Sequence, residues 1–289
     1  MNNEKQYYTD INSKIIDKWV DDGWCWGEPI SHEVYAKALR GDWSVLLTPS
    51  KPVPHEWFLP YLKNNRLTGT KLLGLASGGG QQMPVFTALG ADCTVLDYSD
   101  KQLESEKMVA EREKYAIDIV KADMTKRLPF DDETFDIIFH PISNCYVEDV
   151  YHIWNECFRV LKKGGVLLAG MDNGINFLFD DHDSDPLTVT NKVPFNPLKD
   201  QGLFDKYVAS DGLQFSHTME EQIGGQLKAG FRLTDLYEDR EPEGKLGRHF
   251  PQYISTRVIK PPENHGRSKH TDHRNSGRQD ELIEMRRDL

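Results

Sequence analysis

KLLGLASGGGQQ, residues 71–82, joins an apolar run that is typical of a buried strand to three consecutive glycines. Glycine allows a backbone to approach a ligand closely and to adopt dihedral angles that other residues avoid. A second apolar run, residues 93–96, ends on Asp97. A carboxylate at the end of the second strand of a dinucleotide-binding fold accepts hydrogen bonds from the ribose hydroxyls. The two features together predict a pocket for a cofactor that contains adenosine.

The kind of cofactor follows from what the glycine run lacks. The nicotinamide fingerprint is Gly-x-Gly-x-x-Gly, and here Gly78 and Gly80 are followed by Met83 at the third position. A phosphate-binding loop would end in Gly-Lys-Ser/Thr, which is absent, and no Lys or Arg lies between Lys71 and Lys101 to hold a pyrophosphate. S-adenosylmethionine carries a ribose but no phosphate, so it fits this segment better.

Three further segments follow in the order of an alternating strand–helix fold. Residues 120–124 are typical of a short strand that ends in Asp-Met, residues 135–140 of a buried strand, and residues 157–170 of a helix end, a glycine turn and another strand. Together with residues 71–97, they resemble the class I S-adenosylmethionine-dependent methyltransferases, and within that class the small-molecule branch related to the ubiquinone and menaquinone methyltransferases. The resemblance covers roughly residues 66–260. It implies an enzyme with an α/β, Rossmann-like, doubly wound sheet of seven strands, the last of them antiparallel.

Two positions depart from that family's pattern. Its glycine loop usually begins with an acidic residue followed by Gly-x-Gly-x-Gly, whereas here Gly74 replaces the acid and Ala76 replaces the first glycine. The resemblance implies that the acid helps to hold the amino group of the methionine moiety. We therefore expect that contact to come from a backbone carbonyl or from Gln81.

The composition limits the classes of function. The 289 residues have 38% hydrophobic content, which is enough for one sizeable core, and a formal net charge of -11. Nucleic acids and anionic membrane surfaces are bound by basic faces, so we expect neither as a partner. No apolar run approaches the length of a bilayer span, and the first six residues lack the apolar core of a secretion signal, which predicts a cytoplasmic protein. The four cysteines form no Cys-x-x-Cys pair, and we expect no disulfide.

Three zones are predicted along the chain. Residues 1–65 hold five of the six tryptophans and are expected to form a mostly helical, aromatic-rich cap that acts as a lid. Residues 66–260 form the cofactor-binding domain, and residues 170–212 are a substrate-side insertion because they follow the carboxyl end of a strand. Residues 261–289 are poor in apolar residues and predict a disordered tail. The expected strands are 71–75, 92–97, 117–121, 134–140, 165–170, 231–237 and 252–259, and the expected helices lie near 81–90, 100–114, 148–162 and 218–229.

The ends of the strands define the predicted cofactor site. An ordinary turn at the glycines and a helix-capping role for Asp97 are the alternatives, but the position of each directly after a strand favours ligand binding. The order of the elements in the resemblance implies that the segment after the third strand contacts adenine. The predicted cofactor-binding residues are Ala76, Ser77, Gly78, Gly79, Gly80, Gln81, Asp97, Tyr98, Asp123, Met124 and His140.

His140 and Asn144 are the predicted catalytic residues, because they follow the fourth strand, where the methyl group should point. Imidazole titrates near neutral pH, so His140 is a candidate general base, and a local structural hydrogen bond is the equal alternative. The acidic run 180–185 lacks the glycine and the terminal Glu of a calcium-binding loop, so no metal site is predicted. The predicted acceptor-site residues are Trp24, Trp26, Tyr146 and His249, with packing against the sheet as the alternative for the tryptophans.

The sequence therefore predicts an S-adenosylmethionine-dependent methyltransferase that acts on a small-molecule acceptor by in-line methyl transfer. The cofactor carries the chemical driving force, and the protein supplies orientation and desolvation. Two alternatives stay open from the residues alone. One is a protein that binds S-adenosylmethionine without catalysis, and the less favoured one is a nicotinamide-dependent oxidoreductase.

Overall fold

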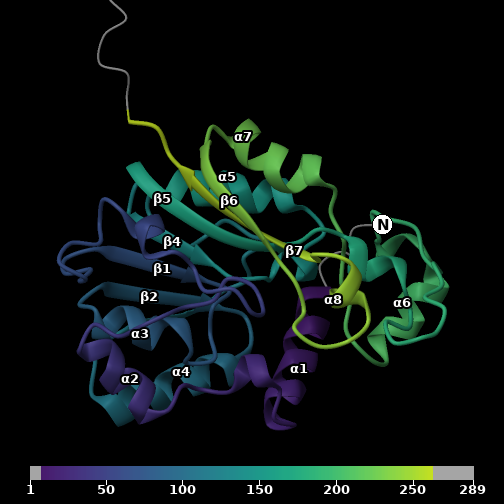
Figure 1. Cartoon of the computed structure of the whole chain (residues 1–289), viewed down its shortest axis with the longest axis horizontal. Coiled ribbons are helices and arrows are strands. Elements are labelled where there is room, and N and C mark those ends of the chain that lie inside the picture. Colours follow the sequence, from purple (N-terminus) through teal and green to yellow (C-terminus); the bar gives the residue numbers. More distant parts are fainter. Residues whose placement is uncertain (1–7, 263–289) are drawn as a thin grey trace, which may run out of the picture.

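The structure, a computed structural model, describes residues 8–262 as a seven-stranded sheet with helices on both faces (Figure 1). The order across the sheet is β3-β2-β1-β4-β5-β7-β6, with β1 to β5 parallel and β7 antiparallel to both β5 and β6. This confirms the predicted α/β, Rossmann-like, doubly wound sheet. Most of the predicted tail, residues 261–289, lies outside the described residues. The strands are β1 Lys71–Leu75, β2 Asp92–Asp97, β3 Asp118–Lys121, β4 Phe135–His140, β5 Leu161–Asp172, β6 Arg232–Asp239 and β7 Tyr253–Ile259.

The helices begin where local sequence signals place them. Ser99 precedes α4, and its side-chain oxygen accepts a hydrogen bond from the amide of Gln102 at 3.1 Å. Thr218 and Glu221, at the start of the helix expected near 218–229, form a capping box in which each amide donates to the other side chain, at 2.8 and 3.2 Å. None of the helices in the described part of the chain is long and apolar enough to cross a membrane. The helices are α1 Tyr8–Asp21, α2 His32–Leu39, α3 Gln82–Ala88, α4 Asp100–Glu113, α5 Val150–Val160, α6 Gln201–Val208, α7 Gly225–Ala229, which follows a π-helical turn at Glu220–Gly224, and α8 Leu246–His249.

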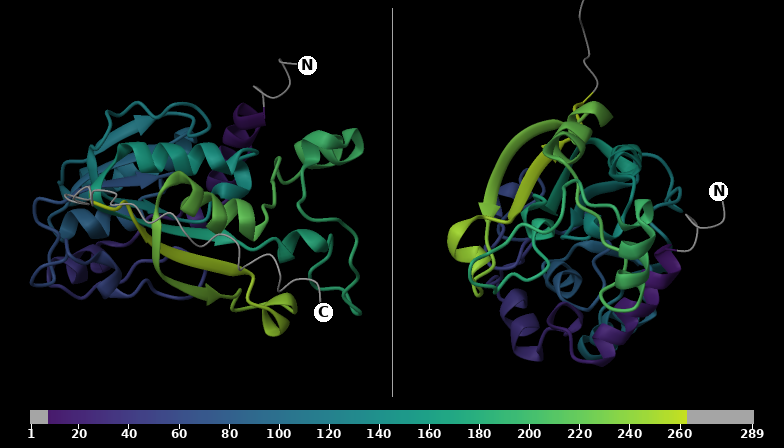
Figure 2. Two further views of the ribbon diagram at one scale, coloured as in Figure 1. Left: turned by 90° about the horizontal axis from the view of Figure 1, so that it is seen from above. Right: turned by 90° about the vertical axis from the view of Figure 1, so that its right-hand side faces the viewer.

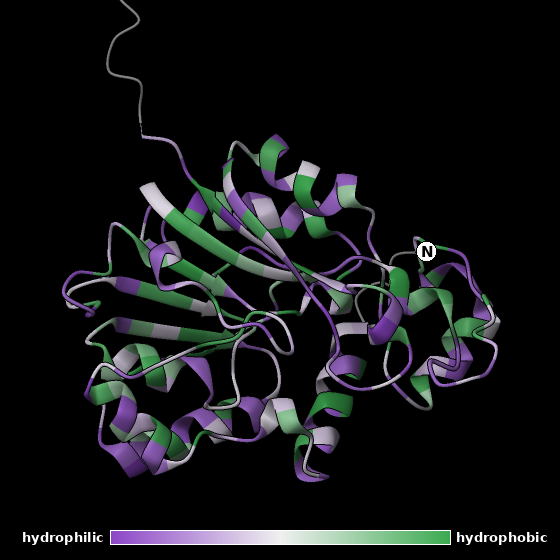
Figure 3. Ribbon diagram, viewed as in Figure 1, coloured by the Kyte–Doolittle hydropathy of each residue, from purple (hydrophilic) through white to green (hydrophobic). Residues whose placement is uncertain are grey.

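Side chains of the central strands alternate between two buried faces of the sheet. Leu72 and Phe139 pack in the cluster that includes side chains of α2 and α3, whereas Leu73 and Ile138 pack in the cluster that includes Trp154 of α5. Both faces are covered, so the middle of these strands is mostly apolar, as the mainly green strands of Figure 3 show.

The N-terminal zone is less helical than predicted. Only α1 and α2 are α-helical there, and residues 40–65 are irregular apart from one short 3-10 turn. Four prolines within residues 49–60 explain the difference, because proline lacks a backbone donor and its ring clashes with the preceding helical turn. Trp57 and Phe58 of this segment are buried in the main core. The segment therefore completes the core of the sheet domain.

The segment between β5 and the helix that starts near residue 218 extends beyond the carboxyl ends of the parallel strands (Figure 2). It contains α6 and two 3-10 turns. The end of the segment is held against the loop after β4 by the amide of Phe215, which donates to the carbonyl of Cys145 at 2.7 Å. Asn12 of α1 exchanges two further hydrogen bonds with the backbone of Leu213, at 2.7 and 2.9 Å. The expected insertion thus packs against the loop after β4 and against α1.

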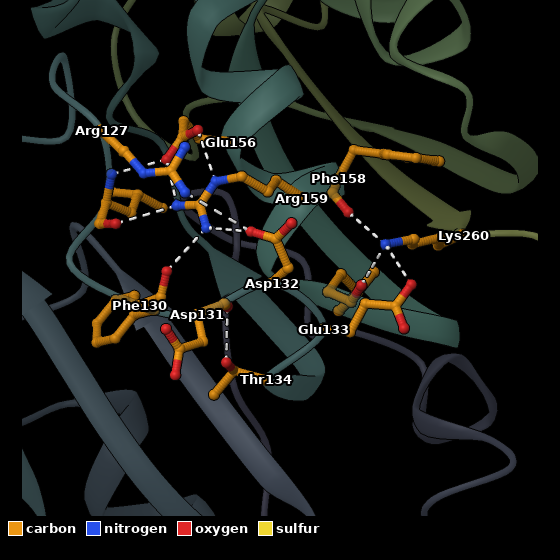
Figure 4. A network of polar contacts seen from close by, with 12 residues as sticks. Arg127, Phe130, Asp131, Asp132, Glu133, Thr134, Glu156, Phe158, Arg159 and Lys260 are labelled. Atoms are coloured by element: carbon orange, nitrogen blue, oxygen red, sulfur yellow. Dashed lines mark hydrogen bonds and ion pairs between the residues drawn. The ribbon is translucent and has the colours of Figure 1, made fainter.

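An ion-pair network lies at the opposite end of the sheet, where the parallel strands begin (Figure 4). Arg159 of α5 donates to Glu156 at 2.6 and 2.9 Å and to Asp132 at 2.8 Å. Lys260 pairs with Glu133 at 3.3 Å and donates to two backbone carbonyls near the end of α5. The contacts hold together the loop before β4, the end of α5 and the end of β7. They are structural and lie away from the carboxyl ends of the strands.

Candidate active site

A cavity of about 250 Å³ lies between α1 and the carboxyl ends of β1, β2 and β4. Within residues 8–262 its lining contains three carboxylates, Asp97, Asp123 and Glu241, and neither Lys nor Arg. The predicted residues that line it are Ala76, Ser77, Gly78, Gln81, Asp97, Tyr98, Asp123, Met124, Trp24, Trp26 and Tyr146. The predicted residues that stand outside its lining are Gly79, Gly80, His140, Asn144 and His249.

Asp97 is held in a defined orientation at the edge of the cavity. One carboxylate oxygen accepts from the amide of Gly78 at 3.0 Å, and the other from the amides of Tyr98 and Ser99 at 2.8 and 3.0 Å. Desolvation raises the pKa of the Asp97 carboxyl, and these three backbone donors oppose the shift. An ionised carboxylate has about four acceptor positions, so three amides leave capacity for a ligand hydroxyl.

The three glycines have different roles from those predicted. A Cβ at Gly78 would lie 2.7 Å from Cβ of Gln102, and a Cβ at Gly79, where φ is +88°, would collide with the amide oxygen of Gln102. The amide of Gly80 donates to the buried carboxyl of Glu106 at 3.1 Å. Gly79 and Gly80 are therefore required by the close packing of the loop on α4. The amide of Gly79 donates to the carbonyl of Gln102 at 2.8 Å, so all three glycine amides are used within the protein, and the expectation of amides that face a ligand is not supported.

Gly74, one of the two departures from the family pattern, is required by its packing against Met83. A Cβ at Gly74 would lie 2.6 Å from the sulfur of Met83. The long side chain of Met83 therefore needs a residue without a side chain at the position of the usual acid. The cavity consequently has no carboxylate at residue 74.

Gln81 does not supply the missing contact with its amide nitrogen. That nitrogen donates to the carbonyls of Cys25 and Glu28, at 2.8 and 2.9 Å, and so fixes the N-terminal segment onto the glycine loop. Gln102 offers a different acceptor, since its side-chain nitrogen bonds the carbonyl of Trp26 at 3.3 Å and its oxygen is buried without a hydrogen-bond partner among the described residues. Gln102 is one of the residues that line the cavity, and an unpaired acceptor of this kind fits a donor such as the ammonium group of S-adenosylmethionine.

The Asp123 side of the cavity is closed by α1. Asp123 accepts from the amide and hydroxyl of Thr125, at 2.8 and 2.7 Å, and from the hydroxyl of Thr9 at 3.0 Å. The hydroxyl of Ser13 donates to the carbonyl of Tyr98 at 2.8 Å. These contacts place α1 across the ends of β2 and β3, where the adenine ring was expected.

His140 does not reach the cavity. It is fully buried, with Nδ1 2.9 Å from the carbonyl oxygen of Leu75 and Nε2 2.9 Å from the side-chain oxygen of Asn144. Burial lowers the pKa of His140, which favours the neutral imidazole. Asn144 is bonded in turn to Gln222 at 2.9 Å. The structure therefore places both residues in a buried link between β1, β4 and the π-helical turn, and the expected roles as base and cofactor ligand are not supported by their position.

His249 is exposed at the end of α8 and lies outside the cavity, so its expected acceptor contact is not supported either. Sequence reasoning missed three other parts of the lining: residues 9–16 of α1, residues 46–49, and the pair Glu241 and Tyr253. Tyr253 could have been found, because it begins the antiparallel strand and the amino end of such a strand lies at the carboxyl edge of its parallel neighbours. Nothing local in residues 46–49 signals that Leu47 packs against the loop after β4 and against Gly170 of β5.

A second cavity of about 350 Å³ adjoins the first. Ile142, Cys145 and Tyr253 line both cavities and form the wall between them. The rest of its lining comes from the end of β5 and the insertion, and is Asp172, Asn176, Phe177, Phe179, Asp180, His182, Asn191, Phe195, Tyr207 and Gln214. Across residues 8–262, no group of three His, Cys, Asp or Glu side chains is arranged to hold a metal ion.

Comparisons with known proteins agree with this geometry. Residues 73–169 match the methyltransferase-domain family. The chain is 41% identical over 254 residues to an uncharacterized methyltransferase of Bacillus subtilis, YbaJ, covering 86% of this chain and 97% of YbaJ. It is 29% identical over 198 residues to the methyltransferase phqN of Penicillium fellutanum, covering 65% and 55%. The crystal structure of an S-adenosylmethionine-dependent methyltransferase from Mesorhizobium loti has the same fold, with a TM-score of 0.58 and 18% identity over 71% of this chain and 94% of that one. This chain therefore belongs to the class I methyltransferases, the enzymes that use S-adenosylmethionine as their cofactor.

Proposed function

We propose that this enzyme methylates a small molecule that enters through the second cavity. The observation that carries this proposal is the shared wall of Ile142, Cys145 and Tyr253 between the cofactor-sized cavity and a second cavity of about 350 Å³. Volumes of about 300–1,000 Å³ are typical of small-molecule sites. The net charge of -11 gives no support to a nucleic-acid acceptor.

The cofactor's adenosine moiety is assigned to the Asp97 side of the first cavity. Asp97 would accept the ribose hydroxyls, and Asp123 and Met124 would contact the adenine ring beneath α1. The buried oxygen of Gln102 would accept from the ammonium group, and the rings of Trp24 and Trp26 offer π faces to positive charge. When bound, S-adenosylmethionine supplies an electrophilic methyl group.

The contribution of the protein is then orientation and the exclusion of water. Residues 8–30 act as a lid, because α1 is bonded to residues of the β2 and β3 ends and the following turn is bonded to the glycine loop. Alignment of two bound reactants can lower a barrier by about 7–11 kcal/mol, so no dedicated base is needed to explain catalysis. The buried, neutral His140 supports the loop after β4 through Asn144. The resemblance to the ubiquinone and menaquinone branch adds a phenolic quinone precursor to the acceptors that a test has to include.

The proposal is tested in two steps with the full-length chain. Isothermal titration with S-adenosylmethionine, S-adenosylhomocysteine and NADH should give micromolar binding of the first two and none of the third. A screen of phenols, amines, thiols and carboxylates, read out as S-adenosylhomocysteine formed, should then give turnover with one small-molecule class. Cofactor binding combined with turnover on RNA or protein alone would contradict the small-molecule proposal.

A further inference from the structure

The floor of the second cavity carries a buried carboxylate. Asp172, the last residue of β5, is 7% exposed. One of its oxygens accepts from the amide of Gly174 at 2.5 Å, and the other from the side-chain amide of Asn176 at 3.0 Å. Two neutral donors leave about half of the acceptor capacity of the carboxylate unused, and Asp172 lines the cavity.

Asp172 also has no positively charged partner among the described residues. Glu156, a comparably buried carboxylate, pairs with Arg159 at 2.6 Å, whereas neither Lys nor Arg lines the second cavity in residues 8–262. A buried charge without a counter-charge is costly. Burial accordingly raises the pKa of Asp172 from 3.8 to about 6, and the hydrogen bonds from Gly174 and Asn176 oppose the shift, with a smaller contribution from His182. A cationic ligand would remove this cost.

The walls of the cavity are aromatic. Phe177 and Phe195 are tilted with ring centroids 5.7 Å apart, and Phe195 and Tyr207 form an edge-to-face pair at 5.5 Å. Asp180 lies at the exposed rim, where it pairs with Lys206 at 3.2 Å. Aromatic faces around a buried carboxylate attract ammonium groups through their negative π faces, and the apolar rings also bind a hydrocarbon framework.

We propose that the second cavity binds an acceptor that carries a cationic amino group, and that Asp172 is the residue that selects this group. This inference rests on the proposed small-molecule function and narrows its acceptor to an amine-bearing aromatic or aliphatic compound. The amino group that binds Asp172 anchors the acceptor; the atom that receives the methyl group lies nearer the shared wall. Selection then comes from one desolvated charge pair, and a neutral acceptor of the same shape leaves the buried carboxylate unpaired.

The test uses matched probes on protein saturated with S-adenosylhomocysteine. The probes are phenylalkylamines with one to four methylenes and the phenylalkanols of the same lengths, and binding is measured by titration calorimetry and ligand-observed NMR. Asp172→Asn preserves size, and Asp211→Asn, an exposed residue of the same insertion outside the cavity, is the control for the loss of one negative charge. At least one amine should bind wild type and the control about tenfold or more tighter than its alcohol, and Asp172→Asn should abolish that preference.

A pH series on the wild-type protein keeps the proposal testable if Asp172→Asn folds poorly. The amines stay protonated between pH 8 and 5, so their affinity should fall as Asp172 gains a proton in this range. The other titratable groups that line this cavity are His182, Cys145, Tyr207 and Tyr253, together with Asp180 at the rim. Amine binding that is independent of pH, or alcohols that bind as tightly as amines, would overturn the role of Asp172 and leave the small-molecule function intact. If S-adenosylhomocysteine binds but no probe does, the selection of an amine by Asp172 is overturned, and the small-molecule function is decided separately by the turnover screen.

Discussion

The substitution Asp97→Asn tests the cofactor assignment with almost no change in volume. In wild type the carboxylate accepts from three backbone amides, of Gly78, Tyr98 and Ser99. The asparagine oxygen can keep the pair at Tyr98 and Ser99, but the new NH₂ group then faces the amide of Gly78, donor against donor. The ribose loses one charge-assisted acceptor and retains a weaker neutral one. A hydrogen bond to a charged group contributes about 1.5–3 kcal/mol, so a net loss of about 2–3 kcal/mol, roughly 30- to 150-fold in affinity, is expected.

The assay is calorimetric titration of S-adenosylhomocysteine into wild type, Asp97→Asn and Asp100→Asn. Asp100 begins α4, is exposed and pairs with Lys121 at 2.6 Å, so its variant loses the same charge three residues away without touching the cavity. A 2′-deoxyribose analogue of the ligand should bind wild type more weakly than the parent does and should bind Asp97→Asn about as well as the parent. The reasoning is refuted if the folded Asp97 variant binds the parent within threefold of wild type, or if both variants weaken binding equally.

Three further outcomes are expected. Glu106 is fully buried between the amide of Gly80 and the hydroxyl of Tyr115, and burial raises its pKa from 4.5 to about 7. The native state thus holds this proton more tightly than the unfolded state, so the associated stability is fully present below pH 4.5 and is lost as the pH rises to 7. In urea unfolding, the free energy of unfolding should therefore fall between pH 5 and pH 8 by about 3 kcal/mol less in Glu106→Gln than in wild type. An unchanged pH dependence in the variant would contradict this reasoning. Burial lowers the pKa of His140, so its ring protons should show constant NMR shifts from pH 8 to 6.5, and a midpoint in that interval would restore it as a candidate base. Asn12→Ala removes both hydrogen bonds to residue 213 and should speed amide exchange in α1 and dissociation of S-adenosylhomocysteine; unchanged rates would show that α1 is no lid.

The parts of this protein that the sequence predicted well have local causes. The strands β1 and β2 were recognisable because an apolar run must be buried on both faces of a parallel sheet. The capping box of Thr218 and Glu221 was recognisable because both partners lie within one helical turn. Asp97 was found in the cavity lining because a residue directly after a strand must lie at the carboxyl edge of the sheet.

The errors concern contacts between residues far apart in sequence. His140 ends β4, but side chains alternate along a strand, and its ring faces Trp154 of α5 at a centroid distance of 6.1 Å instead of the cavity. Three adjacent glycines suggested amides that face a ligand, yet all three amides donate within the protein, and those of Gly79 and Gly80 donate to α4, whose approach no local pattern encodes. The pairing of Gly74 with Met83 likewise became visible only once β1 and α3 were in contact.

The sequence by itself determined the sheet, its order of strands and helices, and the type of cofactor, because periodicity, glycine and the position of an acid act within a few residues of one another. Only the tertiary structure decided what surrounds the cofactor site. The contacts of α1, the packing of residues 46–49 and the buried Asp172 of the second cavity join segments separated by up to about two hundred residues. Such contacts arise from packing of the whole chain, so the proposed acceptor site is a property of the fold, whereas the proposed cofactor site is already visible in the motifs.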